Sequence, residues 1–158
     1  MQRKFILAIE LVPSTVWFSS LHKLMDRKNW ERLKSSVYAR EGRKCWICTS
    51  TQSPLELHEF WEYDDKNHIQ RLAGMHHLCR LCHMIKHMGL WCHTAKGLIT
   101  LNRIGLTRED LIRHFCRVNN CAKEDFLRHE EKAFKIWREK SKSNWTQDFG
   151  EFEKYLKH

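Results

Sequence analysis

The chain has 158 residues, of which 42% are hydrophobic, and it includes seven tryptophans and eight phenylalanines. This composition excludes a disordered tail and is enough for one domain with a buried core. The net charge is +9, and the surplus is uneven: residues 1–48 hold ten Lys/Arg against four Asp/Glu, whereas residues 49–100 hold five of each. A basic flank beside a neutral centre favours a polyanionic partner, nucleic acid before a membrane surface.

No stretch approaches the roughly 18 apolar residues that span a bilayer, so we expect no membrane partner. The segment RKFILAIELV, residues 3–12, begins basic and turns apolar, but Glu10 interrupts it and no small-residue cleavage site follows. A signal peptide is therefore not predicted, and we expect a cytoplasmic protein. Seven cysteines in a reducing compartment are not expected to form a disulfide framework.

Residues 5–12 fit either a strand or the start of a buried helix. Residues 26–42 are predicted to form a helix, because apolar residues recur at helical spacing; Asp26 is a candidate N-cap and Gly42 a candidate C-cap. Residues 43–78 indicate short extended segments joined by loops.

A second helix is predicted from Cys79 to about Leu90. A third is predicted over residues 107–118, with Thr107 at its start and Asp110 three residues on. A longer helix follows the Asn pair at 119–120, and its aromatic residues are expected to pack in a core.

Two Cys-x-x-Cys pairs, Cys45/Cys48 and Cys79/Cys82, are separated by thirty residues. Two-residue spacing lets both thiolates of a pair reach one ion, and four thiolates close a tetrahedron around Zn²⁺, which makes a structural site. The gap is wider than in compact zinc ribbons, so a further segment is inserted between the pairs. The alternatives are four unconnected buried cysteines or a redox pair, although Cys45 and Cys48 lack the strand-to-helix context of the latter.

Histidines surround the second pair. His83 and His87 are four residues apart, so on a helix both imidazoles point to one side and could bind one divalent ion. His58 lies in LELHEF, which reads as a short strand, and an imidazole suits the activation of water near neutral pH. Standing alone, each could be a core histidine. Alternation along a strand would place only one of His76 and His77 on the same face as such a site.

Together these motifs resemble the HNH endonucleases. The resemblance covers about residues 45–87 and reads Cys-x-x-Cys, then Leu-Glu-x-His, then Leu-Cys-x-x-Cys-His-x-x-x-His. HEFWEYDD, residues 58–65, is similar to a phage and bacterial subgroup of that family. The resemblance implies a ββα-metal fold that cleaves DNA strands with an activated water.

The resemblance also assigns roles. Cys45, Cys48, Cys79 and Cys82 fall on the structural zinc positions, His58 on the general base, and His83 and His87 on the ligands of a catalytic divalent cation (Mg²⁺, Mn²⁺, Ni²⁺ or Zn²⁺). Arg43, Lys44 and Lys86 are the candidate DNA contacts.

The chain departs from the family pattern at two positions. Leu57 stands where many HNH enzymes place a ligand, so either Glu59 supplies that oxygen, or His58 binds the metal and Glu59 is the base. Gly74 stands where an Asn is expected, which leaves Asn67 or Gln70 to orient the base. Asp64 is a further candidate to support a ligand.

We therefore expect an α+β protein in which a zinc-stabilised ββα-metal (HNH) core, residues 43–92, is flanked by a basic segment, residues 1–42, and a helical extension, residues 93–158, in one compact domain. The expected function is metal-dependent hydrolysis of DNA. The alternative is a catalytically inactive zinc module that binds nucleic acid or a partner protein. A homodimer or a phage or host protein is a possible further partner.

Overall fold

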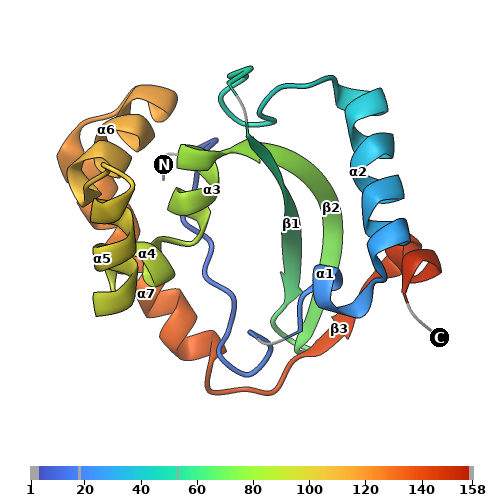
Figure 1. Ribbon diagram of the computed structural model, residues 1–158. Helices are drawn as coiled ribbons and strands as arrows, with labels where there is room; N and C mark the ends of the chain where they lie inside the picture. The colour runs from blue at the N-terminus through green and yellow to red at the C-terminus, as the bar shows by residue number, and fades with distance from the viewer. Residues whose placement is uncertain (1–3, 18, 53, 157–158) are drawn as a thin grey trace.

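The computed structural model describes residues 4–17, 19–52 and 54–156. It is a mixed α+β structure with a three-stranded sheet in the order β1-β2-β3 and helices on both faces of the sheet (Figure 1). The elements are α1 (Leu21–Leu24), α2 (Arg27–Glu41), β1 (Leu55–Asp64), β2 (Ile69–Cys79), α3 (Arg80–Lys86), α4 (Met88–Cys92), α5 (Ala95–Arg103), α6 (Arg108–Asn119), α7 (Lys123–Lys140), β3 (Thr146–Asp148) and the 3-10 helix η1 (Gly150–Tyr155).

The long hairpin of β1 and β2 organises the molecule. The two strands pair antiparallel from Leu55 opposite Cys79 to Asp64 opposite Ile69, with one irregularity after Phe60. The prediction of short extended segments over residues 43–78 therefore missed a single hairpin. Its tight turn is built by Asp64, whose carboxylate accepts hydrogen bonds from the Asn67 backbone and side chain. Asp64 thus closes the turn and does not support a metal ligand.

Two hydrophobic clusters lie on opposite faces of this hairpin. The larger cluster joins the N-terminal segment, the cysteines of the two Cys-x-x-Cys pairs and helices α3 to α7, with Leu7, Leu78, Phe115 and Phe126 fully buried. The smaller cluster lies between α1, α2, η1 and the other face of the strands. The larger cluster contains residues from all three expected segments, 1–42, 43–92 and 93–158. The segment of residues 43–92 therefore does not have a core of its own.

The predicted helix ends agree with the structure where they depend on local chemistry. The Asp26 carboxylate accepts from the Asn29 backbone at 2.7 Å, and Gly42 follows α2 with a φ of 76°. Thr107 and Asp110 form the reciprocal capping box at the start of α6. The helix expected from Cys79 to Leu90 instead breaks at His87, where α3 ends and α4 begins.

Residues 5–12 form neither a strand nor a helix. Their backbone groups bond to side chains of the C-terminal helices: the Asn119 carbonyl accepts from Ile6 and Leu7, and His129 accepts from Ile9. The segment passes between those helices and the sheet (Figure 1). Distant side chains thus replace a strand partner.

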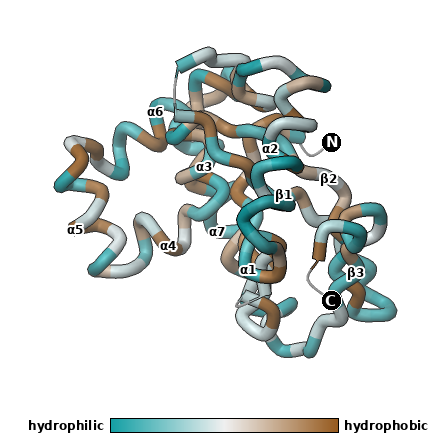
Figure 2. Tube along the Cα trace, turned by 45° about the vertical axis from the view of Figure 1, so that its right-hand side comes forward, coloured by the Kyte–Doolittle hydropathy of each residue, from teal (hydrophilic) through white to brown (hydrophobic). Residues whose placement is uncertain are grey.

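Hydrophobic and hydrophilic residues are interleaved along the helices (Figure 2). Among the described residues, no helix combines the length and the apolar character needed to cross a membrane.

Candidate functional site

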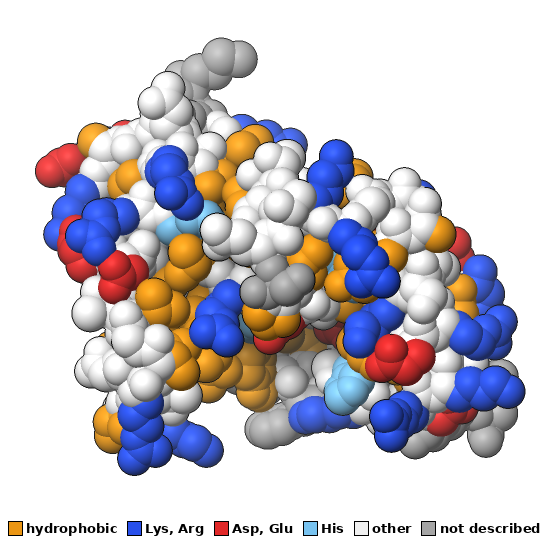
Figure 3. All heavy atoms as spheres, turned by 45° about the horizontal axis from the view of Figure 1, so that its top comes forward, with side chains coloured by type: hydrophobic (Ala, Val, Ile, Leu, Met, Phe, Trp, Pro, Cys, Tyr) orange, Lys and Arg blue, Asp and Glu red, His pale blue; other side chains and the backbone are white. Residues whose placement is uncertain are grey.

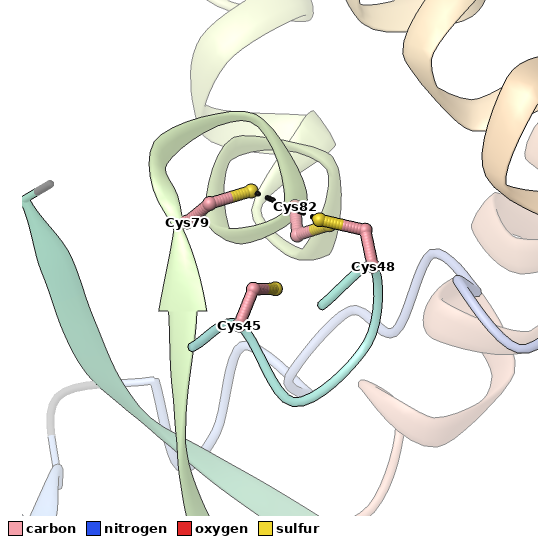
Figure 4. A group of neighbouring side chains, drawn as sticks. All are labelled: Cys45, Cys48, Cys79 and Cys82. Carbon is pink, nitrogen blue, oxygen red and sulfur yellow. Dashed lines mark hydrogen bonds between the residues drawn. The ribbon is translucent and has the colours of Figure 1, made fainter. Parts of the chain in front are cut away.

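The four cysteines of the two pairs meet at the junction of β2 and α3 (Figure 4). Their sulfur atoms all lie within 4.8 Å of one another. The Sγ atoms of Cys48 and Cys79 are 3.6 Å apart, close to the about 3.8 Å edge of a tetrahedral Zn–thiolate centre with 2.3 Å bonds. The donor set therefore fits a structural metal such as zinc, as the sequence predicted.

Backbone hydrogen bonds fix the first pair as a tight turn. The Thr49 amide donates to the Cys45 carbonyl at 3.0 Å, and the Cys45 amide donates to Ser50. The Trp46 amide donates to the His77 carbonyl at 2.8 Å, which attaches this turn to β2. On the other side, Cys79 ends β2 and Cys82 lies in the first turn of α3, so a bound ion would join three elements.

The close sulfur atoms also affect one another's ionisation. Hydrogen bonding from Cys79, and then from Cys82, lowers the pKa of Cys45. The same contact with Cys45 raises the pKa of Cys79 to about 12. Without a cation, a thiolate at Cys45 therefore keeps its neighbour protonated. A divalent ion would allow all of these sulfurs to ionise.

His114 adds a contact from outside the two pairs. Its Nε2 lies 3.2 Å from Cys82 Sγ, and its Nδ1 lies 2.9 Å from an Arg117 guanidinium nitrogen. A guanidinium can only donate, so Nδ1 accepts and Nε2 carries the proton. His114 therefore donates an N–H···S bond to Cys82. The sequence analysis missed this residue, since neither spacing nor motif links α6 to the cysteines.

The structure also brings together the three histidines expected at the second site. Ligand nitrogens of His58, His83 and His87 lie within 4.8 Å of one another, and their ring centroids are 4.8–5.0 Å apart. His58 comes from β1, His83 from α3, and His87 from the residue that ends α3. The three imidazoles line a cavity of about 530 Å³ beside β1.

Two of these imidazoles are held neutral near pH 7. Burial lowers the pKa of His58 well below its usual value, and the nearby His87 and His83 lower it further. Burial also lowers the pKa of His87 to about 4. A neutral imidazole keeps a free nitrogen lone pair, which is the form that binds a metal or accepts a proton.

Glu56 is a site residue that the sequence analysis did not single out. Its carboxylate forms a hydrogen bond with Nδ1 of His83, which leaves Nε2 of that ring for other contacts. Carboxylates in this position fix the orientation of metal-binding histidines. The available signal was strand alternation, since Glu56 and His58 are two residues apart and share a face.

The structure separates Glu59 from the imidazole cluster. Strand alternation turns its side chain to the α1 side, where the carboxylate accepts from the Leu21 amide, although the residue still lines the same cavity. Burial raises its pKa. Leu57 shares that face and packs in the smaller hydrophobic cluster. With its carboxylate bonded to Leu21, Glu59 is neither a further metal ligand beside the three imidazoles nor the general base of that site.

The residues considered for orienting the base have other partners. The Asn67 side chain donates to Asp64 in the hairpin turn, and the Gln70 side chain donates to the Tyr63 hydroxyl at 3.0 Å. At Gly74, a Cβ atom would lie 2.9 Å from Nε2 of His76. Glycine therefore makes room for the His76 ring at the position where an Asn was expected.

Of the three candidate DNA contacts, only two are exposed. Arg43 and Lys44 are solvent-exposed in the turn before Cys45. Lys86 is 2% exposed, pairs with Glu10 at 3.1 Å and lies over the Phe60 ring. The expectation for Lys86 was wrong, because the N-terminal segment folds over α3 and covers that side chain. Arg80 and Lys23 instead border a neighbouring cavity of about 550 Å³ that His83 and His87 share.

Comparison with models of protein families, with curated proteins and with solved structures finds no match to this chain. The assignment of a function therefore depends on the site itself.

Proposed function

We propose that this protein is a metal-dependent endonuclease of the HNH type that hydrolyses DNA phosphodiester bonds. The single observation that carries the proposal is the convergence of three imidazoles in one cavity beside a helix that begins in a tetrathiolate cluster. In this reading the hairpin and α3 are the ββα-metal core. The cysteines hold zinc for structure, and the imidazole cluster is the catalytic centre.

The roles of the histidines follow from their contacts. His83 is oriented by Glu56, which bonds to its Nδ1 and leaves its Nε2 as the nitrogen that would bind a metal. His87, kept neutral by burial, is the second ligand for a divalent cation. Such a cation would stabilise the charge that develops on the phosphate and on the leaving oxygen. His58, on the facing strand, accepts the proton of the attacking water.

Basic side chains on the surface of the protein could contact an anionic substrate. Lys and Arg side chains predominate over Asp and Glu on the face drawn in Figure 3. Arg80 is exposed at the start of α3 and borders the cavity that His83 and His87 share. Arginine suits a phosphate because its guanidinium donates two parallel hydrogen bonds. Arg80 thus takes the phosphate-binding role that had been expected of Lys86.

Nicking of supercoiled plasmid tests the proposal. Zinc-loaded protein with added Mg²⁺, Mn²⁺ or Ni²⁺ should convert supercoiled DNA to the open circle. His58→Ala should reduce the rate at least about 100-fold, in line with general-base catalysis. His93→Ala is the matched control, because its imidazole bonds to Glu130 outside the cluster. Equal rates for His58→Ala and wild type would remove His58 from the mechanism.

One observation favours a second candidate, a zinc module that binds nucleic acid without cleaving it. Among the described residues, the group of converging ligand atoms holds imidazoles alone: the Glu56 carboxylate is bonded to Nδ1 of His83, and Leu57 packs on the other face of the hairpin. In that case DNA binding should survive the double change His83→Ala with His87→Ala. Nicking should then be absent with every metal tested.

A further inference from the structure

Trp46 is the exposed aromatic residue of the first cysteine pair. Trp46 is 51% exposed, although Cys45 and Cys48, on either side of it in the chain, both belong to the cysteine cluster. One face of the indole is stacked on the His76 ring, with centroids 4.0 Å apart and planes 6° from parallel. The large exposed fraction is therefore consistent with an indole whose opposite face is open.

Hydrogen bonds hold the support beneath Trp46 in place. His76 Nδ1 lies 2.7 Å from the Glu41 carboxylate at the end of α2, which fixes the imidazole plane. The Trp46 amide bonds to β2, and Gly74 leaves room for the His76 ring. An aromatic ring fixed in advance loses little conformational entropy when a ligand stacks on it.

Trp46 is connected to the imidazole cluster through a series of ring contacts. Centroid distances are 5.3 Å from His58 to Phe60, 5.0 Å from Phe60 to His76 and 4.0 Å from His76 to Trp46. His58 and His76 are also direct cross-strand partners in the hairpin. Trp46 therefore lies within a few nucleotides of a phosphate bound at the cluster.

The residues before Trp46 are cationic. Arg43 and Lys44 are both exposed, and Arg43 lies over the Tyr38 ring with its guanidinium carbon 4.4 Å from the centroid. A flat exposed ring beside two cations matches the composition of sites for single-stranded nucleic acid, where bases stack on aromatic rings and cations follow the backbone. In a duplex the base faces are already stacked on one another, so such a ring selects an unpaired base.

We propose that Trp46 is a stacking platform for one unpaired nucleobase close to the site of cleavage, with Arg43 and Lys44 contacting the adjacent phosphates. This inference rests on the proposed nucleic-acid function and deepens it, since it makes the substrate a strand with at least one unpaired base. A flap, a gap, a loop or a single strand meets that description.

The test compares binding to unpaired and paired DNA by fluorescence anisotropy. The probes are a labelled oligothymidine about 12 nucleotides long and a blunt duplex of the same length, at fixed salt and without added divalent cation. Trp46→Ala should weaken binding to the unpaired probe about 10-fold and binding to the duplex less than about 2-fold. Trp46→Phe should retain most of the affinity.

Controls separate stacking from folding. Trp46→Leu keeps an apolar cover over His76 but lacks an aromatic face, so it should lose affinity like Trp46→Ala while its zinc content stays at the wild-type level. Ile136→Ala removes exposed apolar surface from α7 and should change neither affinity. Unchanged binding of Trp46→Leu to the unpaired probe would overturn the platform, as would an equal loss for both probes.

The two proposals can fail separately. Binding that depends on Trp46 without nicking under any metal would retain the platform and remove the nuclease. Nicking by a Trp46→Leu protein that binds unpaired DNA like wild type would retain the nuclease and remove the platform.

Discussion

Nε2 of His114 donates a hydrogen bond to Sγ of Cys82, 32 residues away in the chain. The contact joins α6, in the helical extension, to the cysteine cluster that begins α3. Hydrogen bonds to a metal-bound thiolate fix its orientation and reduce its charge. His114 would therefore act as a positioning residue for a metal held by the four cysteines, and it couples the C-terminal helices to the cysteine cluster.

Replacing His114 by Ala should speed the loss of zinc. Removal of a partner outside the ligand set usually costs metal affinity by about 10- to 100-fold, and we expect a change in this range. The measurement is the rate of zinc release to a colorimetric chelator. Arg113→Ala, on an exposed position of the same helix, should release zinc at the wild-type rate. Equal rates for His114→Ala and wild type would show that the bond to Cys82 does not hold the metal.

Glu56→Gln should weaken metal binding at the imidazole cluster while leaving the cysteine cluster unaffected. The carboxylate orients His83 and raises the basicity of its free nitrogen, and a neutral amide does this less well. Titration with Co²⁺ or Ni²⁺, followed by absorbance or calorimetry, should show affinity about 10-fold lower. Glu62→Gln, an exposed position on the same strand, is the control. If both variants bind the metal equally well, Glu56 has no role in positioning.

Substitution of Lys86 should change the stability of the protein, whereas substitution of Lys44 should change its DNA binding. Lys86→Ala removes a buried ion pair with a half-exposed Glu10, so it should cost about 1–2 kcal/mol of unfolding free energy in urea. Lys86→Met, which keeps the apolar stem over Phe60, should cost less. Neither change should alter the salt dependence of DNA binding. Lys44→Ala, in contrast, should lower the slope of the logarithm of the binding constant against the logarithm of salt concentration by about 1. A lower slope for Lys86→Met would restore Lys86 as a phosphate contact.

The parts of the fold that sequence could predict are those set by neighbouring residues. Asp26, Gly42 and Thr107 mark helix ends because their partners lie within four residues, and the paired cysteines indicate a metal by spacing alone. The approach of His58 to His83 and His87 was also predictable, because one metal held by both cysteine pairs would place the strand of His58 beside the helix of His83 and His87.

Contacts between distant segments of the chain could not be predicted from the sequence. Residues 5–12 fit either a strand or the start of a helix, but they form neither, and their hydrogen-bond partners are Asn119 and His129, more than 110 residues later. Lys86 carries a charge that favours a surface position, but it is buried over the Phe60 ring and paired with Glu10 of the N-terminal segment. His58 and Glu59 lie on opposite faces of β1, and the sequence did not show which of these faces lies toward α3.

His77 provides a test of the smaller core that is independent of any metal. Its ring is 1% exposed and stacked on Tyr38 at 3.7 Å, and neither ring nitrogen has a hydrogen-bond partner within the described part of the chain. Burial lowers the pKa of His77 to about 4; Glu41 partly opposes this shift, and Lys34 adds to it. A phenylalanine would fill nearly the same space and leave no polar atom unsatisfied. His77→Phe should therefore stabilise the protein by about 1 kcal/mol at neutral pH.

The same substitution should flatten the dependence of stability on pH. In the unfolded chain the pKa of a histidine is near 6.5, so between about pH 6.5 and pH 4 the unfolded state binds a proton that folded His77 excludes. Stability of the wild type should thus fall as the pH drops through this range. Urea unfolding of both proteins at about pH 7.5 and about pH 4.5 measures the difference, and the other buried histidines cancel in the comparison. The advantage of His77→Phe should grow at the lower pH; a constant or shrinking advantage would mean that His77 takes up a proton in the folded protein.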